Sequence, residues 1–411
     1  MENNRRVVVV GMGIRSPIGN TIGEFENSLK EGRSGICLMP DWKDVKRLRT
    51  HVAGLSNIKG EEKFIPRQHR RSMGKVATFA ALSAMDAVKA SGLSEEEIAS
   101  PFCGVAYGST QGSLGSQMDY ISRMFLSRTL EGIPASFYLK CMGHTCAGNI
   151  SILFHPRGPF IASSTACVSG SQGIGFGYEA IRAGRADIMI TGGAEEVDYL
   201  SAAVFDLMMA TSAEYNDRPT ETPRPFDADR DGLVVAEGAG TLILEEYERA
   251  KKRGAPILGE IEGFWTNGSG VHLTNSDARS MEECLRFALK DARRNPEEIQ
   301  YINAHATGTT HGDEVEAIVT NKIFGPKIPV SSLKGHMGHT MGACGAIEAI
   351  ATLLMMREGF MASTLNLQNP DPVLPPLKHV LGGTWNQRFN LSMSNNFAFG
   401  GVNTSLILSA V

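Results

Sequence analysis

PFIASSTACVSGSQG, residues 159–173, is an apolar run that leads through small residues and a cysteine into a helical pattern. The run at 160–163 predicts a buried strand because it is short, apolar and followed by serine, and residues 170–182 have the spacing of a helix. The stretch IPVSSLKGHMGH, residues 328–339, repeats this order before a helical pattern at 345–356. Strands that alternate with helices predict an α/β fold with mainly parallel sheets.

Similar patterns recur along the whole chain. Further short apolar runs that predict strands lie at 7–10, 104–107, 188–191, 241–244, 257–261, 301–302, 391–393 and 405–409. Further helical patterns lie at 71–90, 246–253 and 280–293, and a proline-containing irregular excursion lies at 210–231. The repeated strand, turn and helix favour two similar halves, at residues 1–253 and 254–411, although such units resemble one another in many proteins.

The composition excludes several classes of protein. Of the 411 residues, 42% are hydrophobic and 20% are charged, which is ordinary for a globular chain and argues against disorder. The 40 Lys and Arg against 44 Asp and Glu give a net charge of -4, which provides no field for nucleic-acid binding. No apolar run is long enough to predict a membrane span. The 7 cysteines are odd in number and have no paired framework, which indicates the reducing cytoplasm.

Cys167 is the strongest candidate nucleophile. It follows a buried-strand pattern and stands where a helix begins, so the helix dipole is expected to favour its thiolate and to help hold an oxyanion. A cysteine can equally be a small buried apolar residue. The small residues around Cys167 favour the nucleophile.

Two histidines occupy matching places in the second half of the chain. His305 and His339 each follow a predicted strand, where α/β sheets place their ligands. A cysteine with two imidazoles fits acyl transfer, in which a proton and an oxyanion must be managed. A metal site is the weaker alternative, because no helical zinc motif is present. His311 and His336 are interpreted as structural or peripheral.

A basic run at 67–75 contains Arg67, Arg70 and Arg71 at helical spacing. Such a run is usually a solvated face, but on an acidic chain it can also bind an acidic partner. The glycines in GMGIRSPIG, residues 11–19, do not have the spacing of a dinucleotide-binding loop.

Several motifs together resemble those of the beta-ketoacyl-acyl-carrier-protein synthases, in the elongating branch of the thiolase-like condensing enzymes. The motifs are VVVVGMGIRSPIGN, GRSGI, STACVSG, RPFDADRDG, NAHATGTTHGD, KGHMGHTMGACGAIEA and NNFAFGGVN, in this order along the chain. The resemblance implies a thiolase-like five-layered αβαβα fold built from two similar halves. It also implies a homodimer, or a heterodimer with a related subunit.

The resemblance implies a reaction as well. Cys167 takes an acyl group from the phosphopantetheine arm of acyl carrier protein, and His305 and His339 assist decarboxylation of malonyl-acyl carrier protein. The product is beta-ketoacyl-acyl carrier protein, as in fatty acid biosynthesis. Lys334 sets the electrostatics of the histidine pair, and a buried bridge to Glu348 is its structural interpretation.

Further roles are implied by the same motifs, with no tightly bound cofactor and no catalytic metal. The backbone N–H groups of Cys167 and Phe399 form the oxyanion hole. The substrate-binding residues are Thr307, Thr309, Phe397, Phe399 and Gln111, and Arg67, Arg70 and Arg71 bind the carrier protein. Relatives can hold a structural monovalent cation at the positions of Asn303, Glu348 and Asn395.

The sequence also departs from its relatives. The acyl-pocket segment reads GSTQGS, residues 108–113, and Gln111 places an amide where an alkyl chain would lie. Ala398 and Val402 replace the familiar Gly and Thr. We therefore expect a short, polar or unsaturated chain, as in polyene or polyketide biosynthesis.

Two alternatives to this activity differ in their cysteines. A degradative thiolase would need a second reactive cysteine near the end of the chain, where FAFGGVN stands instead. A non-catalytic partner subunit that controls chain length would lack the nucleophile, but Cys167 is present.

Overall fold

The computed structural model describes residues 5–411, in which a mixed β-sheet forms the framework. Its strand order is β11-β10-β9-β12-β13-β8-β1-β7-β6-β4-β5. The strands are β1 (Val7–Arg15), β4 (Cys103–Gly108), β5 (Phe160–Ser163), β6 (Ile188–Glu195), β7 (Gly238–Glu246), β8 (Gly259–Gly268), β9 (Tyr301–Asn303), β10 (Pro329–Ser331), β11 (Lys378–His379), β12 (Leu391–Ala398) and β13 (Val402–Ser409). A separate ribbon contains β2 (Ile36–Leu38) and β3 (Val52–Gly54).

The two halves of the sheet have the same pattern of strand directions. β1, β7 and β6 are antiparallel, and β6, β4 and β5 are parallel. Likewise β8, β13 and β12 are antiparallel, and β12, β9 and β10 are parallel. The expected two similar halves are therefore confirmed, although their boundary at residue 253 stays a prediction. β1 joins the halves because it also pairs with β8.

The expectation of mainly parallel sheets is wrong for the centre of the molecule. β12 and β13 are separated only by residues 399–401, and so short a connection can join only antiparallel strands. The other half reaches the same arrangement through the long segment 196–237, which brings β7 back against β6. The parallel pairs are those joined by crossover helices.

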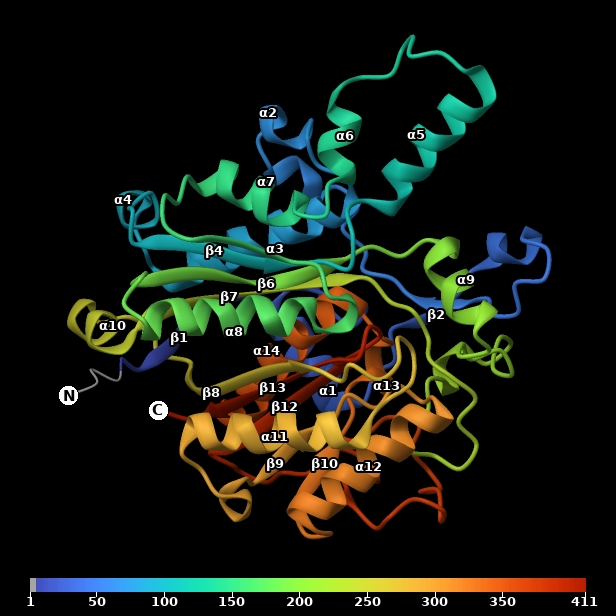
Figure 1. Cartoon of the computed structure of the whole chain (residues 1–411), viewed down its shortest axis with the longest axis vertical. Helices are drawn as coiled ribbons and strands as arrows, with labels where there is room; N and C mark the ends of the chain where they lie inside the picture. The colour runs from blue at the N-terminus through green and yellow to red at the C-terminus, as the bar shows by residue number, and fades with distance from the viewer. Residues whose placement is uncertain (1–4) are drawn as a thin grey trace.

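Helices and sheet alternate in five layers, as expected (Figure 1). α3 (Lys75–Ser91) packs on β1 and β7, α8 (Ser169–Arg182) and α14 (Cys344–Glu358) lie between the halves, and α11 (Ala278–Ala292) with α12 (Thr310–Phe324) forms the opposite outer layer. α14 is buried along almost all of its length, because a helix in the central layer meets protein on every side. The remaining helices are α1 (Ile22–Glu31), α2 (Arg67–Arg70), α4 (Glu95–Ile98), α5 (Leu114–Ser127), α6 (Ser136–Cys141), α7 (Thr145–Phe154), α9 (Tyr199–Leu207), α10 (Tyr247–Arg253) and α13 (Lys334–Met337).

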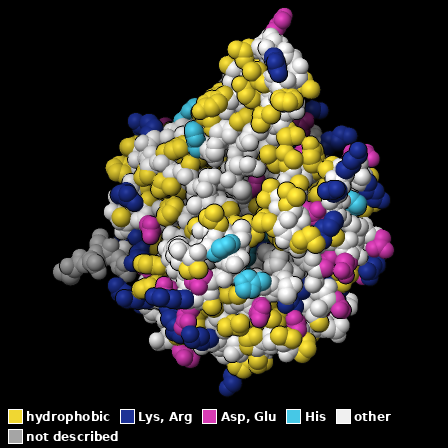
Figure 2. Space-filling model, turned by 45° about the vertical axis from the view of Figure 1, so that its right-hand side comes forward, with side chains coloured by type: hydrophobic (Ala, Val, Ile, Leu, Met, Phe, Trp, Pro, Cys, Tyr) yellow, Lys and Arg dark blue, Asp and Glu magenta, His cyan; other side chains and the backbone are white. Residues whose placement is uncertain are grey.

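One predicted buried strand is exposed in the single chain. β5 lies at the edge of the sheet, and Phe160 is 50% exposed. Apolar side chains also gather on the projecting lobe of α5 and α6 (Figure 2). The exposed large residues there include Ile121, Phe125, Leu126, Leu130 and Tyr138. Apolar surface of this extent is typical of an interface.

Three other expectations concern the whole chain. Apart from a 3-10 turn at Pro219–Glu221, the excursion at 210–231 is irregular, as expected. Within residues 5–411, no helix combines the length and the apolar character that crossing a bilayer requires. All cysteines in this range are free thiols.

Candidate active site

Cys167 lies in a tight turn between β5 and α8. The turn is the 3-10 segment Ala166–Val168, and Ala166 has a φ of 51°, in the left-handed region that non-glycine residues rarely occupy. A strained turn between a strand and a helix can present a nucleophile at the top of a sheet. The Cys167 thiol is 2.9 Å from Nε2 of His339. The structure therefore brings together the thiol and one of the two imidazoles that the sequence analysis singled out.

The protonation states of this pair follow from burial. Desolvation raises the pKa of the Cys167 thiol to about 12, although the Lys334 ammonium opposes this shift. Burial and the same ammonium hold the pKa of His339 well below its ordinary value. Burial therefore opposes the stabilisation of the thiolate that was expected from the helix dipole, and the contribution of the dipole stays a prediction. At neutral pH a thiol faces a neutral imidazole that can take its proton.

His305 follows β9 and lies beside His339 as expected. The two ring centroids are 5.1 Å apart and the rings are nearly perpendicular. Cys167 Sγ and one nitrogen of each ring lie within 4.8 Å of one another. Three such atoms can also hold a metal ion. Burial, and after it the nearby Lys334 charge, lowers the pKa of both histidines, and the same positive charge disfavours a bound cation.

The Lys334 charge is balanced inside the protein. Its Nζ is 2.5 Å from Oε1 of Glu348, and each side chain is 1% exposed. Asn303 Nδ2 also donates to Glu348. A buried pair of this kind is costly to break, because the remaining charge would have no partner. The bridge inferred from the sequence is therefore present, and it fixes a positive charge beneath both imidazoles.

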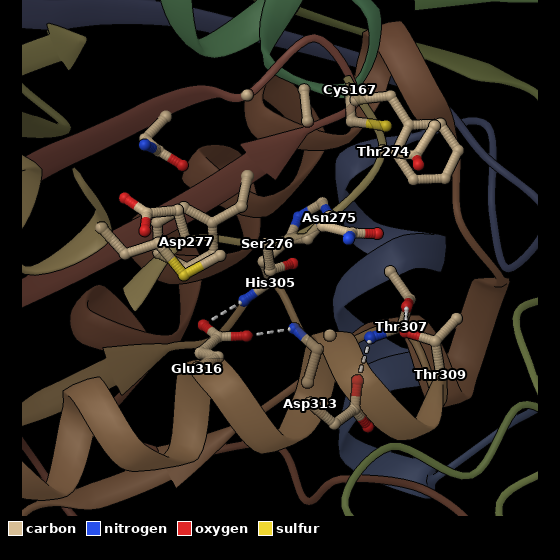
Figure 3. A pocket seen from close by; sticks show the side chains of 18 of the residues that line it. Cys167, Thr274, Asn275, Ser276, Asp277, His305, Thr307, Thr309, Asp313 and Glu316 are labelled. Carbon is tan, nitrogen blue, oxygen red and sulfur yellow. Dashed lines mark hydrogen bonds between the residues drawn. The ribbon is translucent and has the colours of Figure 1, made fainter. Parts of the chain in front are cut away.

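One cavity, open to solvent, contains most of the predicted substrate residues (Figure 3). Its lining includes Cys167, His305, His339, Thr307, Thr309, Phe397 and Phe399. The Oγ1 atoms of Thr307 and Thr309 are 3.0 Å apart. Gln111 is not part of this lining in the single chain, and its role stays a prediction.

The aromatic ring of Phe399 packs on a neighbouring helix. Its centroid is 5.5 Å from that of Phe205, which belongs to α9. The oxyanion-hole and gate roles of Phe399 stay predictions.

The basic run lies outside the cavity. α2 ends at Arg70 and α3 begins at Lys75, so the helical spacing expected over residues 67–75 is interrupted. Arg67 and Arg71 are exposed and Arg70 is half-buried. Lys75 instead pairs with Glu237 at 2.6 Å. The three arginines remain available on the surface, and their binding role stays a prediction.

His311 and His336 lie where a peripheral or structural role was expected. His311 is exposed on the first turn of α12. His336 is buried, and its ring nitrogens are 3.3 Å and 2.9 Å from the carbonyl oxygens of Arg33 and Ser363.

Two buried carboxylates that the sequence analysis missed hold the loop of His305. Glu316 accepts from the N–H groups of His305 and Ala306 at 2.8 Å and 2.6 Å, and Asp313 accepts from that of Thr307 at 2.9 Å (Figure 3). Burial raises the pKa of Glu316 to about 8 and that of Asp313 to about 6. Their spacing places both on one face of α12, directly after the histidine loop, and this was the available signal.

Comparisons with known proteins agree with this geometry. The family described as "Beta-ketoacyl synthase, N-terminal domain" matches residues 4–250, and "Beta-ketoacyl synthase, C-terminal domain" matches residues 258–368. The 3-oxoacyl-[acyl-carrier-protein] synthase 1 of Haemophilus influenzae is 35% identical over 98% of both chains. A beta-ketoacyl synthase structure from Burkholderia phymatum has a TM-score of 0.96 and 44% identity, and covers 99% of this chain and 100% of the other.

Two further solved structures come from complexes. The ishigamide ketosynthase/chain length factor has a TM-score of 0.92 at 29% identity, covering 99% of this chain and 100% of the other. A type II polyketide synthase acyl-carrier protein in complex with its ketosynthase has a TM-score of 0.90 at 28% identity, covering 100% of both chains. With the matched family models, these similarities show that the chain belongs to the beta-ketoacyl synthase family and is an acyltransferase-type condensing enzyme.

Proposed function

We propose that the chain condenses an acyl group, carried on Cys167, with malonyl-acyl carrier protein to give beta-ketoacyl-acyl carrier protein. The observation that carries this proposal is the thiol 2.9 Å from Nε2 of His339, in a cavity that His305 also lines. The name of the Haemophilus relative supports the carrier-bound substrate.

In the first half-reaction the Cys167 sulfur attacks the thioester carbonyl of the acyl carrier. Its proton passes to Nε2 of His339, and the carbonyl oxygen becomes an oxyanion that backbone N–H groups can stabilise. When the tetrahedral intermediate collapses, the carrier thiol leaves with this proton. The acyl group then remains on Cys167, and His339 is neutral again.

In the second half-reaction the malonyl group loses carbon dioxide. The electron pair of the broken bond forms an enolate, whose thioester oxygen can accept from N–H groups of His305 and His339. The enolate carbon then attacks the acyl carbonyl on Cys167, and the sulfur leaves as a thiolate that takes up a proton from water to restore the thiol. His339 Nδ1 has no hydrogen-bond partner among residues 5–411, so no neighbour fixes its tautomer and Nε2 can accept or donate.

Mass spectrometry of the protein after incubation with acyl carrier substrate tests the proposal. We expect one acyl adduct on Cys167 and none in Cys167→Ala, with at least a roughly 10³-fold loss of condensation. An adduct on another residue, or condensation that persists in Cys167→Ala, would contradict the covalent mechanism.

For the acyl group we propose a short, polar or unsaturated chain. The cavity lining includes the polar residues Asn275 and Ser276, whose side chains a saturated alkyl chain would leave without hydrogen bonds. The similarity to ketosynthases of polyketide systems agrees with this choice. Turnover of saturated and polyunsaturated acyl carriers of matched length tests it, and preference for long saturated chains would refute it.

We also propose that a second chain covers β5 and the lobe of α5 and α6. An edge strand with apolar side chains can extend its sheet by pairing with another edge. The partner is a second copy or a related subunit, as the ketosynthase/chain length factor structure suggests. Such a partner would also complete the surroundings of Gln111.

A non-catalytic role in a heterodimer is the alternative. The thiol and both histidines argue against it, because a subunit that only shapes chain length does not need a nucleophile beside a base. Absence of any acyl adduct on Cys167 in the pure protein would favour this alternative.

The predicted monovalent cation fits these residues in part. Asn303 Oδ1 is buried without a hydrogen-bond partner in the described structure, and Glu348 offers a carboxylate. Lys334 already neutralises that carboxylate, and Asn395 Oδ1 accepts from Ser405. The cation stays a structural proposal.

A further inference from the structure

Asn396, on β12, is fully buried, and its side-chain amide contacts Glu348, His305 and Cys344. Its Nδ2 is 2.7 Å from Glu348 Oε2, 3.5 Å from His305 Nδ1 and 3.6 Å from Cys344 Sγ. Acceptors therefore surround this atom, and one of them is a carboxylate. The reverse orientation of the amide would place Oδ1 against that carboxylate, so the NH₂ group must face Glu348, His305 and Cys344.

This orientation determines which nitrogen of His305 carries the hydrogen. An amide NH₂ group can only donate, so Nδ1 of His305 must accept, and in the neutral ring the hydrogen is then on Nε2. The bond is long, as catalytic hydrogen bonds often are before substrate binds. The strong contact to Glu348 anchors the amide.

The same amide is connected to the nucleophile. Cys344 Sγ is 3.2 Å from the carbonyl oxygen of Cys167, to which its S–H donates, and the sulfur lies 3.6 Å from Nδ2 of Asn396. Cys344 is buried at the start of α14 and cannot act on substrate directly. Asn396 thus contacts His305 directly, whereas its path to Cys167 runs through the Cys344 thiol and ends at a backbone carbonyl, not at the reactive sulfur.

We infer that Asn396 is a positioning residue that keeps the hydrogen of His305 on Nε2, where it can be donated to the malonyl thioester oxygen. The inference rests on the proposed function. It explains why a buried strand carries a polar side chain at this position. The inference also predicts that Asn396 affects decarboxylation more than acyl transfer, because acyl transfer uses His339 as the base and decarboxylation uses the N–H of His305.

The first test compares the two half-reactions in Asn396→Ala. We expect malonyl decarboxylation to fall about 10- to 100-fold, the range found when a residue that orients a functional imidazole is removed. Acylation of Cys167, followed by mass spectrometry, should change by less than about threefold. An equal fall in both rates would show a merely structural role and overturn the inference.

A matched control is Asn149→Ala. Asn149 is also a buried asparagine, but its side chain bonds to Ser72 and Thr145, away from the catalytic groups. It should destabilise the protein without separating the two rates. If Asn149→Ala also lost much more decarboxylation than acylation, a specific role for Asn396 would be refuted.

The second test needs no variant of Asn396. Nitrogen NMR of the ¹⁵N-histidine-labelled protein reports which ring nitrogen carries hydrogen, and His305→Ala identifies the signals. We expect an unprotonated Nδ1 in the unmodified protein, and hydrogen on that atom would overturn the inference. If the proposed function itself fails, the unmodified protein will neither acylate nor decarboxylate, whereas the tautomer can still be measured.

Discussion

A single buried ammonium influences the pKa of three side chains in the candidate active site. Lys334 lowers the pKa of His305 and His339 and opposes the raised pKa of Cys167. Burial, assisted by the positive charge of Lys334, keeps both imidazoles neutral, so each can accept or donate a proton at neutral pH. The site therefore needs no resting ion pair between thiolate and imidazolium.

Replacing His305 with alanine should separate the two half-reactions. The enolate would lose one N–H donor, and removal of such a donor costs about 10²- to 10³-fold in rate. Cys167 should still be acylated, because His339 remains 2.9 Å from its sulfur. Carbon dioxide release and acyl-adduct formation measure the two steps. Equal losses in both would show that His305 serves acyl transfer as well.

Removing the buried charges should move the pH dependence of acylation. In the double variant Lys334→Met/Glu348→Gln the ammonium no longer lowers the pKa of His339, so that pKa should rise. The base is active when neutral, and activity is lost as the pH falls through its pKa. The acid limb of the acylation rate should therefore shift to higher pH. An unchanged limb would show that Lys334 does not control His339.

At the level of the elements, the sequence predicted most strands and helices but not their directions. Apolar runs and small turn residues identified β1, β6 and α14, since their patterns are local. The antiparallel direction of the central strands depends on the path of the chain between them. Hydrophobic periodicity does not describe that path. Glu316 was missed for another reason, because hydrophobic periodicity does not reveal that a helix carboxylate accepts from the N–H groups of the loop before that helix.

The surface around α2 gives a prediction at this scale. Reversing the charge of Arg70 and Arg71 should raise the apparent KM for carrier-bound substrates by roughly tenfold, since several rim charges act together on an acidic partner. Small coenzyme A analogues should be turned over normally, because neither arginine lines the cavity. Steady-state kinetics with both substrate types decides this. An equal rise in the apparent KM for the small analogues would indicate damage to the active site instead.

The molecule as a whole should depend on β5 for assembly. Phe160→Asp places a charge on the exposed apolar edge and should convert the proposed dimer into a monomer, as measured by sedimentation. Val373→Asp is the control, because Val373 is also largely exposed but lies far along the sequence from the edge strand. Dissociation by the control, or an unaffected mass for Phe160→Asp, would exclude this interface.

Overall stability should depend on the pH through Glu316. Its pKa rises to about 8 on folding, so between its ordinary pKa and pH 8 the folded chain binds more protons than the unfolded chain. The contribution of Glu316 to the free energy of unfolding must therefore fall as the pH increases through this range. Glu316→Gln should show a smaller decrease in thermal midpoint from pH 5 to pH 8. An equal decrease in the thermal midpoint of the variant and of the unmodified protein would exclude this contribution of Glu316.

The central place of β1 has a consequence for synthesis on the ribosome. β1 is made first, yet its two neighbours β7 and β8 begin only at Gly238 and Gly259. Until they emerge, an extended apolar segment has both edges unpaired and available to other nascent chains. Pairing across such long stretches of sequence is slow and exposes intermediates to aggregation. Productive folding of this chain should therefore depend on protection by chaperones until more than half of it has been translated.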